Sequence, residues 1–325
     1  MPVACMCGSR VYKVKITMPE TKRESTGFEL TKQRYGKNNV KFLRVVRDGP
    51  KHEVKELRVR ILLEGAFEIS YTQGDNSTIV ATDTQKNTLF ALAKLHPIEP
   101  LEQWCLQVAN DFLARHKHIS AVNLKVEEHP WDRIRVSGKE HDHAFEKGSG
   151  GIRIVKLRMP RNGTPSLSAG FRDLEILKTT QSGFEGFIRD EYTTLPETRD
   201  RVFATKMKCE YTFNRFSRTA FSSIQEKVKE IALSTFAGNI EGGTYSPSVQ
   251  QTLYQTAQKV LNTIPEVETI SFSLPNVHYY LCDFKNFKTN VPNNNEVFHT
   301  YDGPSGLIEA TVSRNSASHL GRAKM

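Results

Sequence analysis

The sequence contains no apolar run of the roughly 20 residues that a membrane-spanning helix needs. The first 30 residues also lack an uninterrupted apolar segment, because Arg10, Lys13 and Lys15 break it, and they make a poor secretory signal. We therefore expect a protein of the cytosol or of an organelle, with no membrane as its partner.

Cysteine is scarce. The five residues, Cys5, Cys7, Cys105, Cys209 and Cys282, are odd in number and scattered, which argues against a disulfide framework. The first two have no second pair nearby with the spacing of a structural zinc site. We expect reduced thiols.

The chain also lacks a long basic block and the aromatic-basic signature of an RNA-binding sheet, although its net charge is +9. Lysine and arginine alternate with glutamate and aspartate, as in residues 127–147. We expect no nucleic-acid partner. A focused positive site for a small anion remains compatible with this composition.

The same order of elements occurs twice in a chain long enough for about two domains. Hydrophobic periodicity predicts strands, paired helices and strands in each half. In the first half these are strands 40–46 and 55–71, helices 86–95 and 101–117, and strands 121–127 and 152–159, with a polar hairpin region between the last two. In the second half they are strands 167–179 and 201–213, helices 222–236 and 247–262, and strands 269–274 and 307–312.

This repeat predicts an α+β fold of two tandem units, each an antiparallel four-stranded sheet with two helices on one face. The turn-rich segment 160–165 marks the boundary between them. The expected organisation is an N-terminal extension over 1–30, units over 31–162 and 163–316, and a tail over 317–325. Such sheets have open edges, which neighbouring subunits can cover by continuing the sheet.

Two helix starts are candidate anion sites. Thr82-Asp83-Thr84 reads as capping sequence before a helix near Lys86, and Ser246 reads as an N-cap with Pro247 in the first helical position. Unpaired amides and the helix dipole at such starts attract anions. The amides of Asp83 and Val249 are the candidates, although most sequences of this kind are simply capped helices.

Five separated motifs carry a resemblance to a known family. They are Arg34-Tyr-Gly-Lys-Asn-Asn-Val40, Asn76-Ser-Thr-Ile-Val-Ala-Thr-Asp-Thr84, the segment 171–207, Tyr245-Ser-Pro-Ser-Val-Gln250 and Ser273-Leu-Pro-Asn-Val-His-Tyr279. Together they closely resemble the urate oxidase family over about residues 35–314. The resemblance implies the tunnelling fold: two tandem units per chain, and a homotetramer whose sheets close into a barrel.

The resemblance also assigns substrate-binding residues. Arg201 matches the arginine that grips the purine by a bidentate contact, for which a planar guanidinium is suited. Gln250 matches the amide on the opposite edge, and Phe184 the ring on which the purine stacks. The amides of Val249 and Asp83 match backbone contacts to substrate.

The implied reaction needs no cofactor. Asn276 and Thr82 match the pair that holds water or dioxygen above the purine, and Lys37, Thr82 and His278 match a proton relay. Urate is a monoanion at neutral pH, and losing another proton makes it electron-rich enough to reduce O2 without a metal or flavin. A lysine poised near working pH suits that task. The implied products are 5-hydroxyisourate and hydrogen peroxide.

In the family the two sets of residues meet across a subunit interface. Lys37, Thr82 and Asp83 come from the first unit and the others from the second. We therefore expect a homotetramer with shared sites and an inactive monomer.

Two histidine pairs, His116/His118 and His141/His143, resemble metal ligands in spacing. The first pair falls at the polar end of a helix, where positive charge suits the dipole, and the resemblance implies no metal. The chain ends Arg322-Ala-Lys-Met325, a variant of the peroxisomal Ser-Lys-Leu pattern, which predicts a peroxisomal location and an import receptor as partner, with the cytoplasm as the alternative.

Three other functions compete with this resemblance and are less favoured by these residues. One is a tunnelling-fold enzyme acting on a pterin or another purine with zinc, which would need clustered histidines and an anchoring glutamate. Another is a purine-binding homologue without turnover, and the third is a nucleic-acid-binding module.

Overall fold

The computed structural model describes residues 4–6, 11–13, 27–214 and 220–315. The chain divides into two compact units, Met1–Gln33 and Arg34–Met325. In the first, β1 (Ala4–Met6) pairs antiparallel with β2 (Val11–Lys13). Most of the predicted extension, and the whole of the tail 317–325, lie outside the described residues.

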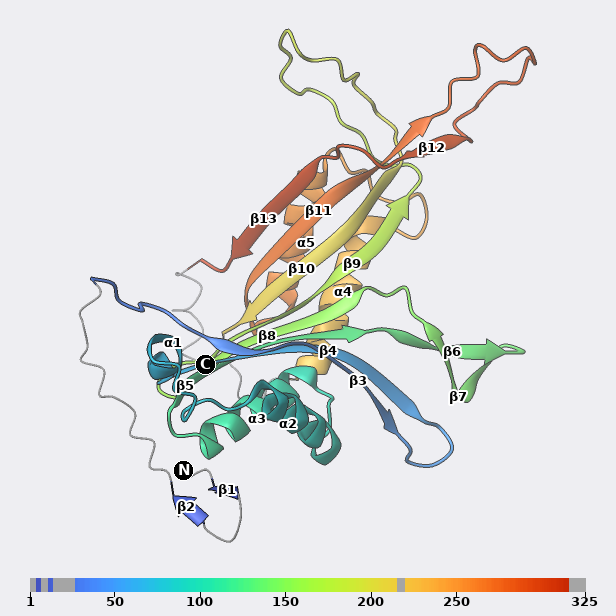
Figure 1. Ribbon diagram of the computed structural model, residues 1–325. Helices are drawn as coiled ribbons and strands as arrows, with labels where there is room; N and C mark the ends of the chain where they lie inside the picture. The colour runs from blue at the N-terminus through green and yellow to red at the C-terminus, as the bar shows by residue number, and fades with distance from the viewer. Residues whose placement is uncertain (1–3, 7–10, 14–26, 215–219, 316–325) are drawn as a thin grey trace, which may run out of the picture. The chain divides into compact units, whose positions relative to one another are not determined.

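The second unit is built on one nine-stranded antiparallel sheet (Figure 1). Its strands run in the order β12-β11-β10-β9-β8-β5-β4-β3, and β13 pairs with β11 as well. Their bounds are β3 Tyr35–Val46, β4 Glu53–Gly65, β5 Ile119–His129, β8 Ile152–Pro160, β9 Ser166–Lys178, β10 Phe203–Phe213, β11 Val267–Leu281, β12 Phe298–Tyr301 and β13 Leu307–Ser313. A separate hairpin, β6 (Trp131–Val136) with β7 (Lys139–Lys147), projects between β5 and β8.

The first half contributes four strands to this sheet and the second half five, including the short β12, and each half contributes a pair of long helices. The helices are α1 Glu68–Thr72, α2 Thr82–Leu95, α3 Leu101–Arg115, α4 Phe221–Ala237 and α5 Val249–Thr263. Helix α3 packs on β5 and β8, and α5 packs on β11 and β13. The predicted fold class, with antiparallel strands and paired helices, is confirmed.

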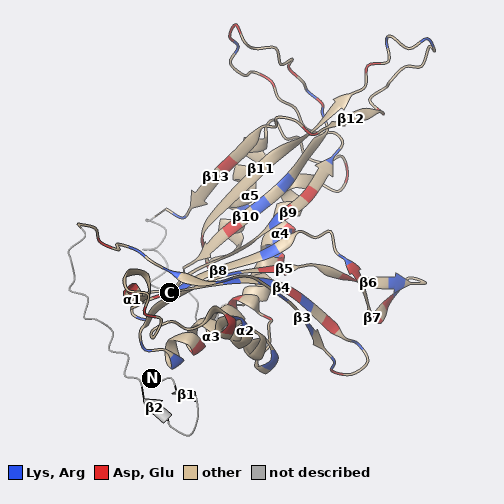
Figure 2. Cartoon of the chain, viewed as in Figure 1, with Lys and Arg blue, Asp and Glu red and all other residues tan. Residues whose placement is uncertain are grey.

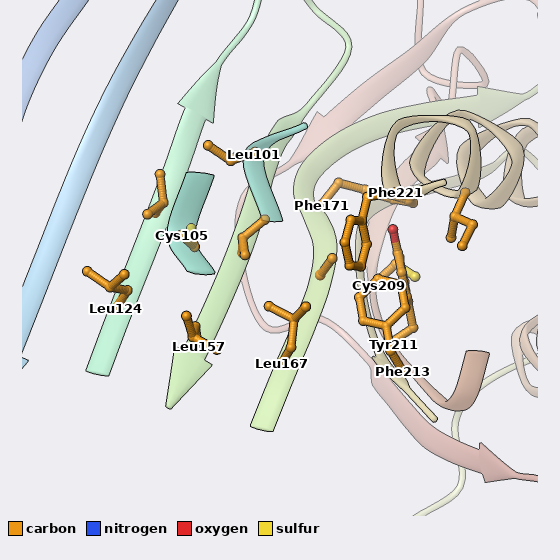
Figure 3. Close-up of a cluster of buried hydrophobic side chains, with 14 of the residues drawn as sticks. Leu101, Cys105, Leu124, Leu157, Leu167, Phe171, Cys209, Tyr211, Phe213 and Phe221 are labelled. Atoms are coloured by element: carbon orange, nitrogen blue, oxygen red, sulfur yellow. The ribbon is translucent and has the colours of Figure 1, made fainter. Parts of the chain in front are cut away.

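The two halves are joined into one sheet by the pairing of β8 with β9. The predicted boundary 160–165 is the turn of this hairpin. Side chains from α3, β5, β8, β9, β10 and α4 accordingly meet in one core (Figure 3). Trp104 and Tyr211, one from each half, are its largest fully buried side chains.

In each half an arginine binds backbone carbonyls at the end of the second long helix. Arg161 donates from Nε to the carbonyl of Ile119 (2.8 Å), and from Nη2 to Leu113 (2.9 Å) and His116 (2.7 Å). These carbonyls stand three residues apart, at and just beyond the end of α3.

Arg314 repeats this arrangement at the end of α5. It donates from Nε to Val267 (2.8 Å), and from Nη2 to Leu261 and to Ile264 (2.9 Å), with the same three-residue spacing. A guanidinium suits this place because the last carbonyls of a helix lack intrahelical donors and carry its negative dipole end. The internal repeat therefore extends to individual hydrogen bonds.

Several predicted boundaries are wrong. The strand predicted over 55–71 ends at Gly65, where β4 loses its partner β5, and the chain continues into helix α1. Residues 67, 69 and 71 alternate like a strand, but Gln73 N–H bonds to the Ile69 carbonyl as in a helix. Strand β12 was not predicted.

Both predicted helix starts are also misplaced. Helix α2 begins at Thr82 rather than near Lys86, and its N-cap is Ala81, with no side-chain cap. Helix α5 begins at Val249, and its N-cap is Ser248, whose Oγ accepts from the Gln251 N–H at 3.1 Å. Ser246 and Pro247 therefore precede the helix.

Candidate functional site

Lys37 lies on β3, at a place where the strand is deformed. Between Lys37 and Val40 the pairing with β4 shifts by one residue, which is a β-bulge. Asn39 adopts a left-handed φ of 58°, which asparagine tolerates better than most residues. At Gly36 a Cβ atom would stand 2.0 Å from the Ile61 carbonyl oxygen. The motif 34–40 thus shapes the strand that carries Lys37.

Tyr35, which the sequence reasoning did not single out, connects this strand to the start of α2. Its hydroxyl accepts from the Val80 N–H (2.8 Å) and lies 3.2 Å from the Val80 carbonyl. The ring packs edge-on against Phe67 at 4.8 Å, and burial raises the pKa of the phenol. In the sequence, Tyr35 could have been identified by its position next to Gly36 in the first motif.

Thr82 and Asp83 open helix α2 next to Lys37. The hydrogen bond from Lys86 to the exposed Asp83 carboxylate (2.6 Å) lowers its pKa, and the charge of Lys37 contributes to the same shift. Because Ala81 supplies no side-chain cap, the first amides of α2 have no side-chain acceptor from the cap position. Lys37, Thr82 and Asp83 therefore form one cluster, the first half-site.

Phe184 and Arg201 stand at the base of the long loop between β9 and β10. Phe184 N–H bonds to the Thr198 carbonyl (2.7 Å), the reverse bond is 3.1 Å, and Arg201 N–H bonds to the Ser182 carbonyl (2.9 Å). At Gly183 a Cβ atom would stand 2.0 Å from the Tyr245 hydroxyl and 2.8 Å from the Thr198 carbonyl oxygen, so a side chain there would displace its neighbours. These bonds hold the loop base closed.

The Arg201 guanidinium is half-buried, 5.6 Å from the centroid of the Phe184 ring. Burial lowers its pKa, and within the described residues its Nε is buried without a hydrogen-bond partner and no carboxylate pairs with it. A desolvated cation of this kind is suited to an anionic ligand.

Phe184 is also stacked on a second ring. Phe187 lies parallel to it, with centroids 4.9 Å apart and planes 9° apart, and the Arg189 guanidinium lies 5.1 Å from the centroid of Phe187. A planar ligand can therefore stack only on the opposite face of Phe184.

The start of α5 lies against this loop. Ser182 and Ser246 form a parallel bridge, through bonds from Gly183 N–H to the Ser246 carbonyl (3.0 Å) and from Ser246 N–H to the Gln181 carbonyl (2.9 Å). Val249, which is buried, and Gln250, which is exposed, follow directly at the first turn of the helix.

Asn276 and His278 lie on β11, beside the beginning of β10. Asn276 pairs with Thr205, and its N–H bonds to the Gly306 carbonyl at 2.8 Å. His278 is opposite Tyr301 of β12 and stacks at 5.6 Å on Tyr280. Both are half-buried and two residues apart, so they share one face of the strand. Asn276, His278, Phe184, Arg201, Val249 and Gln250 are the candidate residues of the second half, and we call them the second half-site.

The two half-sites are far apart within one chain. Lys37 lies on β3 and His278 on β11, with five strands between them in the sheet order. At the usual strand spacing the separation along the sheet is about 30 Å. Within one chain, Lys37 therefore does not meet His278.

Within each of the two histidine pairs, one member makes a local structural contact. His141 Nδ1 accepts from the backbone N–H groups of His143 (3.2 Å) and Ala144 (3.1 Å). His116 ends α3, and burial lowers its pKa. No group of three or more histidine, cysteine, aspartate or glutamate side chains with metal-binding geometry occurs in the described ranges.

Charge is distributed as the composition suggested. Lysine and arginine are interspersed with aspartate and glutamate along the strands (Figure 2). Among the described helices, none has the length and apolarity required to cross a membrane.

Comparison with known proteins gives consistent matches. A family model described as Uricase matches residues 33–154 and 167–309. The chain is 39% identical over 300 residues to the uricase of Oryctolagus cuniculus, covering 92% of this chain and 99% of that protein. It is 42% identical over 290 residues to the uricase of Dictyostelium discoideum, covering 88% and 98%. Among solved structures, uricase from Arthrobacter globiformis matches with a TM-score of 0.81 and 37% identity, covering 89% of this chain and 96% of that chain.

Proposed function

The chain belongs to the uricase family and is an enzyme that oxidises urate, and from this premise we propose that it does so with O2 and no cofactor, at sites shared by two subunits. The single observation that carries the proposal is the half-buried Arg201 beside Phe184, which offers an unpaired cation and an aromatic face to a planar anion. Gln250, at the exposed start of α5, would bind the opposite edge of the purine.

The chemistry follows from the substrate. Lys37, acting through Thr82, removes a proton from bound urate, and His278 completes the relay. The resulting dianion gives two electrons to O2, water adds to the oxidised ring, and 5-hydroxyisourate and hydrogen peroxide leave. Asn276 and Thr82 hold O2 or water above the ring, while the amides of Asp83 and Val249 bind substrate.

The separation of the half-sites supports a shared site. Strand β3 ends the sheet at one side, and β12 and β13 end it at the other. Leu43 on β3 is 52% exposed, so this edge offers both backbone groups and apolar surface to another copy of the chain. Continuation of the sheet through such edges would close a barrel in a homotetramer and bring Lys37 of one subunit to Arg201 of another.

The first test follows urate absorbance and oxygen uptake together, with purified protein treated with a chelator. We expect one O2 consumed and one hydrogen peroxide formed per urate. Loss of turnover that returns with added zinc would contradict cofactor independence and favour the metal-dependent pterin or purine enzyme. Urate binding without turnover would indicate the non-catalytic homologue.

A second test uses mixed subunits. Lys37→Ala and Arg201→Ala chains, each inactive alone, are co-expressed in equal amounts. A shared site is intact when its Lys37 comes from an Arg201→Ala chain and its Arg201 comes from a Lys37→Ala chain. Random pairing gives this combination at about a quarter of the sites, so about a quarter of wild-type activity should return. Absence of any recovery in verified mixed oligomers would contradict a shared site.

We also propose a peroxisomal location with recognition by an import receptor, on the chemistry of Ala323-Lys324-Met325. Deleting these three residues from a tagged chain should move it from peroxisomes to the cytosol. An unchanged distribution would rule out this signal.

A further inference from the structure

Lys178 is a half-buried lysine beside the second half-site to which no role has been given. It is the last residue of β9, paired with Phe203 of β10. Its ammonium lies 5.9 Å from the ring centroids of both Phe203 and Phe236, which are themselves buried. A lysine here is costly, because it loses hydration, and burial indeed lowers its pKa.

The ammonium is directed to the segment before α5. It donates to the Thr244 carbonyl (3.0 Å) and to Ser246 Oγ (2.8 Å), and no carboxylate in the described part of the chain pairs with it. Ser246 is therefore not the helix cap that its sequence suggests. Its hydroxyl is an acceptor for Lys178.

Ser246 is also the residue that joins the two binding segments. Its N–H and carbonyl bond to Gln181 and Gly183, directly before Phe184, and Val249 follows three residues later. The Lys178 ammonium thus binds residues 244–246. The spacing between the Phe184 loop and the first turn of α5 depends on this segment.

Resting on the proposed function, we propose that Lys178 is a positioning residue for urate binding, which clamps residues 244–246 so that Phe184 and the start of α5 form one preorganised purine-binding surface. It does not touch the substrate. Its effect is on affinity, because a surface that is already ordered loses less entropy when the ligand binds. The hydrogen bonds of a charged donor are strong enough for their loss to be measurable.

The test is the dissociation constant for urate, measured without oxygen so that no turnover occurs, together with KM and kcat in air. For Lys178→Met we expect Kd and KM to rise about tenfold while kcat stays within about twofold. Lys178→Arg, which keeps a charged donor, should restore most of the affinity. Lys229→Met is the matched control, because Lys229 is also half-buried and donates to a backbone carbonyl, that of Gly150 at 2.7 Å, away from the site.

Ser246→Ala keeps the test valid if Lys178→Met does not fold, since it removes only one acceptor. It should raise Kd about threefold, and adding it to Lys178→Met should raise Kd no further, because both act through one contact. An unchanged Kd in folded Lys178→Met, or an equal loss in Lys229→Met, would overturn the inference. Wild-type chain that binds no urate would instead refute the proposed function, so the two failures are distinguishable.

Discussion

The first and second halves of the main unit share a scaffold but contribute different chemistry. In both, two long helices pack on antiparallel strands, and an arginine after the last strand binds three carbonyls at and just beyond the end of the second helix. Arg161 and Arg314 make this contact with the same spacing of acceptors. The hydrogen bonds that tie the end of the second helix to the following strand are thus the same in both halves.

The halves differ in their connections. Residues 47–52 join β3 to β4 by a short turn, whereas residues 179–202 join β9 to β10 by a long loop that carries Phe184 and Arg201 (Figure 1). The first half carries its extra length as the β6–β7 hairpin, away from its candidate residues. Its own half-site depends instead on a bulge and a helix start. The second half therefore places Phe184 and Arg201 on a long loop and its other candidate residues on α5 and β11, whereas the first half places its candidates on a strand and a helix start.

On the proposed function, the first half supplies the base Lys37 with Thr82, and the second half supplies most of the substrate contacts together with His278. The largest effect should come from Lys37→Ala, which removes the proposed base and should lower kcat about a thousandfold with little change in the anaerobic Kd for urate. Lys41→Ala, on the same strand but exposed, should leave kcat unchanged. A normal kcat in Lys37→Ala would contradict the role of Lys37 as the base.

Arg201→Lys tests the binding half. Lysine keeps the charge but cannot make a bidentate planar contact, so Kd for urate should rise about fiftyfold. Titration of binding without oxygen measures it. Arg199→Lys is the control, because Arg199 is 88% exposed and pairs with Glu185. Equal affinities in the two variants would argue against a bidentate grip.

The shared scaffold predicts equal losses of stability from equivalent substitutions. Arg161→Met and Arg314→Met each remove the donor to three carbonyls at and just beyond a helix end, and each should lower the free energy of unfolding by about 2 kcal/mol. Urea denaturation checks this, with Arg135→Met as control, since exposed Arg135 bonds one loop carbonyl at 3.1 Å. A loss confined to one half would break the equivalence.

A smaller effect should come from Phe187→Ala, which removes the ring stacked on Phe184. Kd for urate should rise about fivefold, in line with the value of an aromatic pair, and Phe187→Tyr should keep the wild-type affinity. Phe287→Ala removes a similar stacked pair, with Phe284 at 4.6 Å, from another loop of the same half. If both alanine variants bind urate alike, the backing ring has no specific role.

Sequence reasoning predicted the scaffold well and the local detail less well. Hydrophobic periodicity and the repeat of elements predicted both pairs of helices and most strands of the sheet. The helix starts were misplaced because Ser, Thr and Asp suggest caps wherever they occur. In the structure the N-caps are Ala81 and Ser248, and the Ser246 hydroxyl accepts a hydrogen bond from Lys178.

The two long helices of each half, most strands and the motifs that resemble the uricase family could be predicted from the sequence, because periodicity and local residue patterns are properties of the chain alone. The tertiary structure shows in addition that the two repeats share one sheet and one core, and that five strands separate the strand of Lys37 from the strand of His278. It also placed Lys178 against the segment before α5. Strand neighbours and side-chain partners depend on contacts between residues distant in sequence, and no local pattern encodes them.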